Sequence, residues 1–389
     1  MKKVAIVSCY FMKNYGSVLQ AYATQKILDD FEIENETICI DGLNKEIKNA
    51  KLKYFFNKML DEDVVKNKFI VVKHKICEKL NYHGFKDKMN VRNYAFEEFN
   101  SKFKLSKVYS SFDELKKECA SYTDVLVGSD QLWLPSNIEA DYYTLNWVSD
   151  NINKISYATS FGVSSLEKKY EQLSEKFLKR IDHLSVREQS GKELIRKVSG
   201  IEAEIVCDPT LLFTAEEWME IQKNEPIVLG KYIFCYFIGN NPEQREFVRK
   251  LKSDTGYKIV ALQHIDEYIK SDENFADEAP YDITPGDFIN LIRNAQYVCT
   301  DSFHGSVFSI LNSKKFFTFR RFKQNRKVST NSRLDSLFNL LGLQDRLLNS
   351  NENIEKCLRK EINYNKIHRK LDALREHSKK FLKESLSIN

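Results

Sequence analysis

A histidine marks the junction between two segments of different pattern, and imidazole is the side chain that titrates closest to neutral pH. Residues 297–300 form an apolar run typical of a buried strand, the pair Gly305 and Ser306 starts a predicted helix, and His304 stands between them. Open α/β sheets bind ligands where strands end, and the free N–H groups of helix N-termini attract anions. We therefore predict an anion site formed by Ser302, His304, Gly305 and Ser306. In the competing interpretation His304 only caps or packs the helix.

A second polar loop follows the first predicted strand. Residues 4–7 are typical of a strand buried on both faces, and residues 18–28 predict a helix with Ser17 as its cap. The loop lacks the G-x-G-x-x-G spacing, so it does not indicate a dinucleotide site. Its candidate binding residues are Asn14, Gly16, Ser17 and Gln20.

A third loop carries several hydrogen-bonding side chains directly after a strand. Residues 125–127 form an apolar run, which Gly128, Ser129, Asp130 and Gln131 follow. A glycine allows close approach to the backbone, and polar side chains at the carboxyl end of a strand indicate a binding site. The competing interpretation is an Asx-type turn in front of a core tryptophan.

Strand-like and helix-like segments alternate along the chain, which predicts an α/β fold. The alternation is interrupted by a Trp-containing stretch at 214–228 and resumes at residue 231. We therefore predict one α/β domain at 1–222 and a second at 223–350, with the active site in the cleft between them. Residues 351–389 predict an amphipathic helical tail.

The composition argues against several classes of protein. The 60 basic and 55 acidic residues leave a formal charge of +5, too small an excess to indicate nucleic-acid binding. The 8 cysteines include no C-x-x-C pair and several lie in apolar runs, so we expect free thiols, no metal site and a cytoplasmic protein. No apolar stretch approaches the roughly 18 residues that span a bilayer.

Residues 45–105 are rich in Lys, Asn and Phe and predict helices at 52–60, 64–80 and 93–99. The basic face of this region has two interpretations. It is either a solvated surface or a peripheral contact with an anionic lipid carrier or membrane, at the inner face of that membrane.

Six segments together resemble the polysaccharide pyruvyl transferase family. They span most of the chain and read NYGSVLQAY at 14–22, VGSDQLW at 127–133, YATSFG at 157–162, SVRE at 185–188, DPTLL at 208–212 and TDSFHG at 300–305. The resemblance implies two Rossmann-like domains arranged as in the glycosyltransferase-B fold. It also implies transfer of pyruvate from phosphoenolpyruvate, as co-substrate and without a further cofactor, onto a sugar of a cell-surface polysaccharide precursor that is soluble or lipid-linked.

The resemblance also suggests roles for three residues. Arg187 matches the family's arginine in the SVRE segment and is a candidate for binding one anion of the donor. His304 matches the family's histidine and could deliver the proton that ketal formation requires, or pair with phosphate. Asp130 is a candidate base or acceptor for a sugar hydroxyl.

One position departs from the family pattern. Better-known members carry an arginine two residues before the histidine, where this chain has Ser302. The missing cation could come from the basic segment after residue 319, in which Arg320, Arg321 and Arg326 are candidates. Two alternatives stay open beside the pyruvyl transferase: a glycosyltransferase with a nucleotide-sugar donor, and a non-catalytic protein that binds glycan or phosphate.

Overall fold

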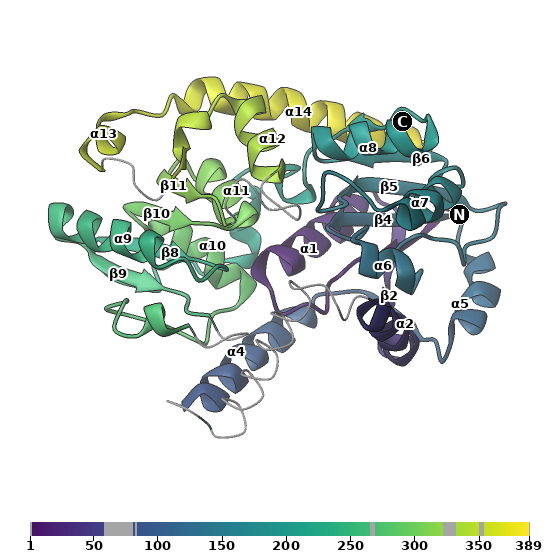
Figure 1. Cartoon of the computed structure of the whole chain (residues 1–389), viewed down its shortest axis with the longest axis horizontal. Coiled ribbons are helices and arrows are strands. Elements are labelled where there is room, and N and C mark those ends of the chain that lie inside the picture. The colour runs from purple at the N-terminus through teal and green to yellow at the C-terminus, as the bar shows by residue number, and fades with distance from the viewer. Residues whose placement is uncertain are drawn as a thin grey trace.

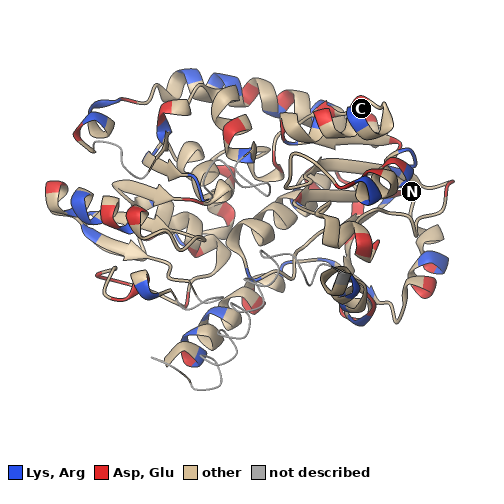
Figure 2. Ribbon diagram, viewed as in Figure 1, with Lys and Arg blue, Asp and Glu red and all other residues tan. Residues whose placement is uncertain are grey.

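The computed structural model describes residues 2–57, 81, 84–264, 269–321, 332–349 and 354–388. The predicted helix at 64–80 lies outside these residues. Two α/β halves lie side by side, and a long C-terminal helix runs across both (Figure 1). Acidic and basic residues are mixed along the outer helices (Figure 2).

A parallel sheet forms the centre of the first half. Within the described residues it has seven strands in the order β3-β2-β1-β4-β5-β6-β7. All its pairings are parallel, and the inner strands are buried on both faces, which explains their continuous apolar runs. The strands are β1 Lys3–Val7, β2 Glu34–Cys39, β3 Leu105–Val108, β4 Asp124–Asp130, β5 Asn153–Thr159, β6 His183–Val186 and β7 Glu204–Ile205.

Helices alternate with these strands. They are α1 Tyr15–Asp30, α2 Asn44–Asn57, α4 Phe85–Asn100, α5 Phe112–Glu118, α6 Pro135–Ala140, α7 Lys168–Leu178 and α8 Gln189–Ser199. The predicted cap of the first helix is wrong. Asn14 is the N-cap of α1, because its side chain accepts from the backbone N–H of Ser17, and Ser17 therefore lies within the first turn.

A smaller parallel sheet forms the centre of the second half, with the strand order β12-β11-β10-β8-β9 in the described part of the chain. The Trp-containing connection to it holds only the short 3-10 helix Glu217–Ile221. The strands are β8 Tyr232–Tyr236, β9 Lys258–Ala261, β10 Tyr297–Thr300, β11 Lys315–Phe319 and β12 Leu347–Leu348. The helices are α9 Pro242–Thr255, α10 Pro285–Asn294, α11 Phe303–Leu311 and α12 Ser332–Leu341.

Each sheet has a point at which the strand order reverses. In the first sheet β1 lies between β2 and β4, and in the second sheet β8 lies between β9 and β10. The loops on the two sides of such a point diverge and leave a crevice at the carboxyl ends of the strands. The fold therefore offers two crevices, one in each half.

The tail consists of α13 Ile354–Arg359 and α14 Tyr364–Ser385, and α14 returns to the first half. Ser378 Oγ accepts from the backbone N–H of Cys207 at 2.9 Å, and Arg375 Nε donates to the carbonyl of Leu211 at 2.9 Å. Near the end of α14, Asn153 Nδ2 donates to the carbonyl of Ser385 at 2.8 Å. The domain limits at residues 222 and 350 stay a prediction.

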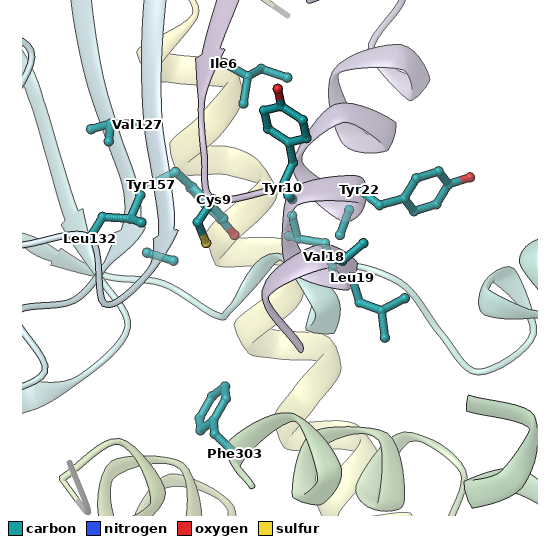
Figure 3. Packing of buried hydrophobic residues seen from close by; sticks show 14 of the residues in the cluster. Ile6, Cys9, Tyr10, Val18, Leu19, Tyr22, Val127, Leu132, Tyr157 and Phe303 are labelled. Carbon is teal, nitrogen blue, oxygen red and sulfur yellow. The ribbon is translucent and has the colours of Figure 1, made fainter. Parts of the chain in front are cut away.

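Aromatic side chains join the two halves. The Tyr15 ring at the start of α1 stacks on Phe288 of α10 with centroids 4.9 Å apart, and its hydroxyl donates to the carbonyl of Ile283. The main cluster of buried apolar residues includes members from both sheets and extends to Phe303 of α11 (Figure 3). Full burial of one such large side chain stabilises a protein by about 1.5–3 kcal/mol, so the halves form one packed body. No helix in the described ranges is long and apolar enough to cross a membrane.

Candidate active site

A pocket of about 390 Å³ opens where the two halves meet. Its walls come from the loops after β1, β4, β8, β10 and β11, so it joins the crevices of both sheets, and α2 and α12 add to them. The polar residues that line it include Asn14, Ser17, Lys51, Asp130, Gln131, Ser302, His304, Arg321 and Arg333.

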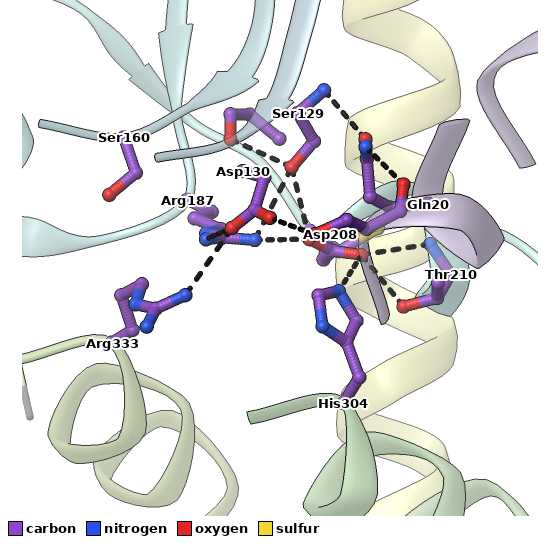
Figure 4. A network of polar contacts seen from close by, with 12 residues as sticks. Gln20, Ser129, Asp130, Ser160, Arg187, Asp208, Thr210, His304 and Arg333 are labelled. Carbon is purple, nitrogen blue, oxygen red and sulfur yellow. Dashed lines mark hydrogen bonds and ion pairs between the residues drawn. The ribbon is translucent and has the colours of Figure 1, made fainter. Parts of the chain in front are cut away.

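Asp208 is the centre of a buried polar network beside this pocket (Figure 4). Its Oδ2 accepts from Arg187 Nη1 at 2.6 Å and from Ser129 Oγ at 3.0 Å. Its Oδ1 accepts from the backbone N–H and the hydroxyl of Thr210, at 3.1 and 2.7 Å. Burial alone would raise the pKa of Asp208, but His304, Arg187 and Thr210 outweigh it and hold the pKa well below its usual range. Asp208 is therefore ionised at neutral pH.

His304 approaches Asp208 from the second half. It is the second residue of α11, and its Nε2 lies 3.5 Å from Asp208 Oδ1. The other side of the ring rests against Gly16, where an added Cβ atom would lie 2.0 Å from Nδ1. Only glycine leaves room for the imidazole at this position. The structure thus brings the predicted residues Gly16 and His304 together, and it gives Gly16 a packing role against the imidazole.

Asp130 at the end of β4 faces the pocket. Its Oδ1 accepts from Arg187 Nη2 at 2.9 Å and from Arg333 Nη1 at 3.4 Å, and its Oδ2 accepts from Ser17 Oγ at 2.8 Å. Burial would raise the pKa of Asp130, but the two guanidinium groups and His304 together lower it below its usual range. A carboxylate held so acidic is a hydrogen-bond acceptor and a poor base.

Arg187 is not among the residues that line the pocket, so it is not placed to bind an anion there directly. Its side chain is 1% exposed and forms ion pairs with Asp130, Asp208 and Glu188 beneath the pocket. Carboxylates on three sides already neutralise the guanidinium, so we replace the predicted role by a structural one. Arg187 also lies over the ring of Phe303, 4.8 Å from its centroid, and so links the halves by a cation–π contact.

Glu188 is fully buried next to Arg187. The hydroxyl of Ser160 donates to its Oε1. Burial raises the pKa of Glu188 in spite of the nearby Arg187 guanidinium. The three carboxylates around Arg187 thus divide into two strong acids and one that holds its proton more tightly than usual.

Three cationic side chains line the pocket: Lys51 of α2, Arg321 after β11 and Arg333 of α12. Burial lowers the pKa of Lys51. The predicted ligand Arg320 is not among the pocket residues, because its guanidinium pairs with Asp335 at 2.7 Å. Arg326 lies outside the described residues.

Gly305 and Ser306 are also misplaced by the sequence prediction. Helix α11 begins at Phe303 because the Ser302 side chain caps it and accepts from the N–H of Gly305 at 3.3 Å. Gly305 packs on Thr300, and the Ser306 hydroxyl pairs with that of Thr318 at 2.8 Å, so both residues face their own sheet. Ser302 itself lines the pocket.

Three other predicted residues support the site from below. Gln20 Oε1 accepts from the backbone N–H of Ser129 at 2.8 Å. Gly128 lets β4 approach β5 closely, since an added Cβ would lie 2.0 Å from the carbonyl of Tyr157. Asn14, Ser17 and Gln131 line the pocket, whereas Gln20, Gly128 and Ser129 lie beneath it.

Sequence reasoning gave no role to Asp208 or Lys51, and it grouped Arg333 with a basic segment of which one or two arginines could reach a phosphate. Asp208 carried a usable signal, because it follows a predicted strand and precedes a proline. Lys51 lies in a lysine-rich stretch, where the sequence does not distinguish one lysine from the next. Arg333 lies in the first turn of α12, outside the six segments that resemble the family. No group of three His, Cys, Asp or Glu side chains within the described ranges is arranged to hold a metal ion.

The arrangement agrees with the comparison to known families. The profile of the polysaccharide pyruvyl transferases matches residues 14–321, most of the chain. The chain belongs to this family. It is accordingly a transferase whose acceptor is a sugar or polysaccharide. No curated protein matches the chain.

Solved structures similar to this polysaccharide pyruvyl transferase family member share its fold at low identity. The UDP-GlcNAc 2-epimerase of Methanocaldococcus jannaschii, in complex with UDP-GlcNAc and UDP, has a TM-score of 0.50 and 14% identity, over 96% of this chain and 99% of the other. The UDP-N-acetylglucosamine 2-epimerase of Rickettsia bellii has a TM-score of 0.50 and 10% identity, over 100% of this chain and 97% of the other. Another UDP-N-acetylglucosamine 2-epimerase has a TM-score of 0.53 and 12% identity, over 99% of this chain and 95% of the other. They confirm two Rossmann-like domains of glycosyltransferase-B-like arrangement.

Proposed function

We propose that the protein transfers the pyruvyl group of phosphoenolpyruvate to two hydroxyls of one sugar in a polysaccharide precursor, forming a ketal. The observation that carries this proposal is the placement of His304. Its ring is held against Asp208 on the wall of a pocket that also presents Lys51, Arg321 and Arg333. Such a pocket combines a proton donor with cations, which is what protonation of an anionic enol phosphate requires.

The reaction balances without an oxidant or a cofactor. A proton adds to the methylene carbon of phosphoenolpyruvate, which becomes a methyl group, and a sugar hydroxyl forms a bond to the adjacent C2. The C2–O bond to phosphate then breaks, and the second hydroxyl closes the ring on C2. Of the two hydroxyl protons, one replaces the proton delivered to carbon and the other leaves with inorganic phosphate.

His304 and Asp130 take different parts in this proposal. The contact of Nε2 with Asp208 favours the tautomer with the proton on that nitrogen, and the carboxylate stabilises the imidazolium that forms when the ring takes up a second proton. Asp130 has too low a pKa to serve as the base, and it orients a sugar hydroxyl as an acceptor. Ser17, which donates to Asp130, fixes the direction of the carboxylate.

The direct test is a reaction in D₂O with phosphoenolpyruvate and a soluble or lipid-linked glycan, followed by NMR. We expect phosphate release together with a ketal methyl group that carries one deuterium, because the donor supplies two of the three hydrogens. A reaction of UDP-GlcNAc with the same glycan would instead support a nucleotide-sugar transferase. Binding of glycan without turnover of either donor would indicate a protein that only binds, and would refute the proposal.

A further inference from the structure

Two guanidinium groups that line the pocket each carry a buried nitrogen without a hydrogen-bond partner among the described residues. These atoms are the Nε of Arg321 and the Nε of Arg333. A buried N–H group without a partner destabilises a protein by about 1–3 kcal/mol, so such groups commonly have a partner that is not part of the chain. Both groups are donors only, and the missing partner must therefore be an acceptor.

Arg333 is tied only loosely to the carboxylate beside it. Its Nη1 lies 3.4 Å from Asp130 Oδ1, an atom that Arg187 already contacts at 2.9 Å. Its guanidinium also lies over the ring of Phe303, 5.8 Å from the centroid, and Phe303 directly precedes His304 in α11. Burial and the repulsion from Arg187 lower the pKa of Arg333 to about 10. An anion in the pocket would stabilise the charged form of Arg333 and so raise its pKa.

Arg321 is similarly incompletely paired. Its nearest carboxylate is that of Asp301, 3.9 Å from Nε. The two Asp301 oxygens already accept from the backbone N–H groups of Ile238 and Gly239, at 2.7 and 2.8 Å. Repulsion from Arg321 contributes to the lowered pKa of Arg333, so the two cations act on each other.

We infer that Arg321 and Arg333 together bind the phosphate group of the donor. This inference rests on the proposed function and names the subsite within it. Two planar guanidinium groups offer several N–H donors to one phosphate, which has more acceptor oxygens than a carboxylate and a second charge. Arg321 follows β11 and Arg333 lies in the first turn of α12. Together they provide the positive charge that Ser302 does not.

The binding of inorganic phosphate and of phosphoenolpyruvate by calorimetry tests this subsite. In the wild-type chain both compounds bind, and pyruvate, which lacks the phosphate, binds far more weakly. Arg333→Met and Arg321→Met each weaken the binding of both phosphate compounds by at least about tenfold, the effect of a lost charged hydrogen bond. Arg249→Met removes a charge from α9, away from the pocket, and leaves binding unchanged.

Thermal unfolding without ligand shows whether each variant is folded, and Arg333→Lys, which keeps the charge, should recover part of the affinity. If the wild type binds phosphoenolpyruvate and both methionine variants bind it equally well, the subsite is wrong while the proposed donor stands. If the wild type binds phosphate through these arginines but not phosphoenolpyruvate, the subsite stands and the proposed donor fails. Absence of binding by the wild type to both compounds overturns the subsite.

Discussion

The imidazole of His304 and the carboxylate of Asp208 meet across the boundary between the two halves, with Nε2 3.5 Å from Oδ1. Neither half provides this pair alone. Asp208 is fixed by Arg187, Ser129 and Thr210, so the first half determines the orientation of a histidine that the second half supplies. The geometry of this pair thus depends on how the halves are packed.

Replacement of His304 tests its part in proton transfer. His304→Ala should lower kcat by about 10²–10⁴-fold, the usual contribution of a general acid or base. The overall fold should remain, which circular dichroism and thermal unfolding would show. A variant that keeps more than a few per cent of the wild-type activity would remove His304 from the chemistry.

Asp208→Asn should lower both stability and activity. Loss of the charge leaves Arg187 buried with one carboxylate fewer, and breaking a buried ion pair destabilises a protein by about 3–5 kcal/mol. Urea unfolding at neutral pH would measure this difference. Asp150→Asn is the control, because Asp150 pairs with Arg180 at the surface and should change stability little.

The same Asp208→Asn comparison predicts a pH dependence. The folded protein lowers the pKa of Asp208, so its contribution to stability is present above the unfolded-state value of roughly 4 and is lost as the pH falls below it. The stability difference between wild type and variant should therefore shrink in unfolding curves recorded below about pH 4. A difference that stays constant down to pH 2 would contradict the assigned ion pairs.

Gly16→Ala should reduce activity through His304. The added Cβ would lie 2.0 Å from Nδ1, so the ring must move away. Displacement of a catalytic group by about 1 Å commonly lowers kcat by about 10²-fold. Gly191→Ala is the matched control in the first turn of α8, where the nearest atom, in Val186, lies at an ordinary 3.4 Å. Equal activities of the two variants would contradict the packing role of Gly16.

Glu188→Gln should change how stability depends on pH. Burial raises the pKa of Glu188, so its favourable contribution is present below the unfolded-state pKa and is lost as the pH rises through the higher folded-state value. The stability of the wild type should therefore fall relative to the glutamine variant as the pH rises above about 4. Glu175→Gln at the surface should not show this decline, since Lys179 lowers the pKa of Glu175. Parallel curves for both pairs would count against the raised pKa of Glu188.

The sequence allowed the strands and their polar loops to be predicted, because parallel strands bring their carboxyl ends to one edge of a sheet. In the structure Asn14, Asp130 and His304, which that rule brought together, line one pocket. It also explains why Ser302 was found and why Asp208 could have been.

The exact position of each side chain depended on contacts between distant segments. Arg187 pairs with carboxylates 57 residues before it and 21 residues after it, and no local pattern indicates such pairs. An error of two residues in the start of α11 directed Gly305 and Ser306 to the pocket instead of the sheet. For the same reason Arg187→Ala should destabilise the fold, because Asp130 and Asp208 each lose their shortest ion pair.

The attachment of α14 has a consequence for the order in which the protein becomes active during synthesis. The two hydrogen bonds from α14 reach Cys207 and Leu211, which lie on either side of Asp208 in the sequence. A ribosome completes the last strand, β12, at residue 348, before it reaches residues 364–385. The nascent chain therefore holds its histidine and its aspartate early but lacks the helix that fixes the segment around Asp208. Catalytic competence should appear only after the C-terminal helix has left the exit tunnel.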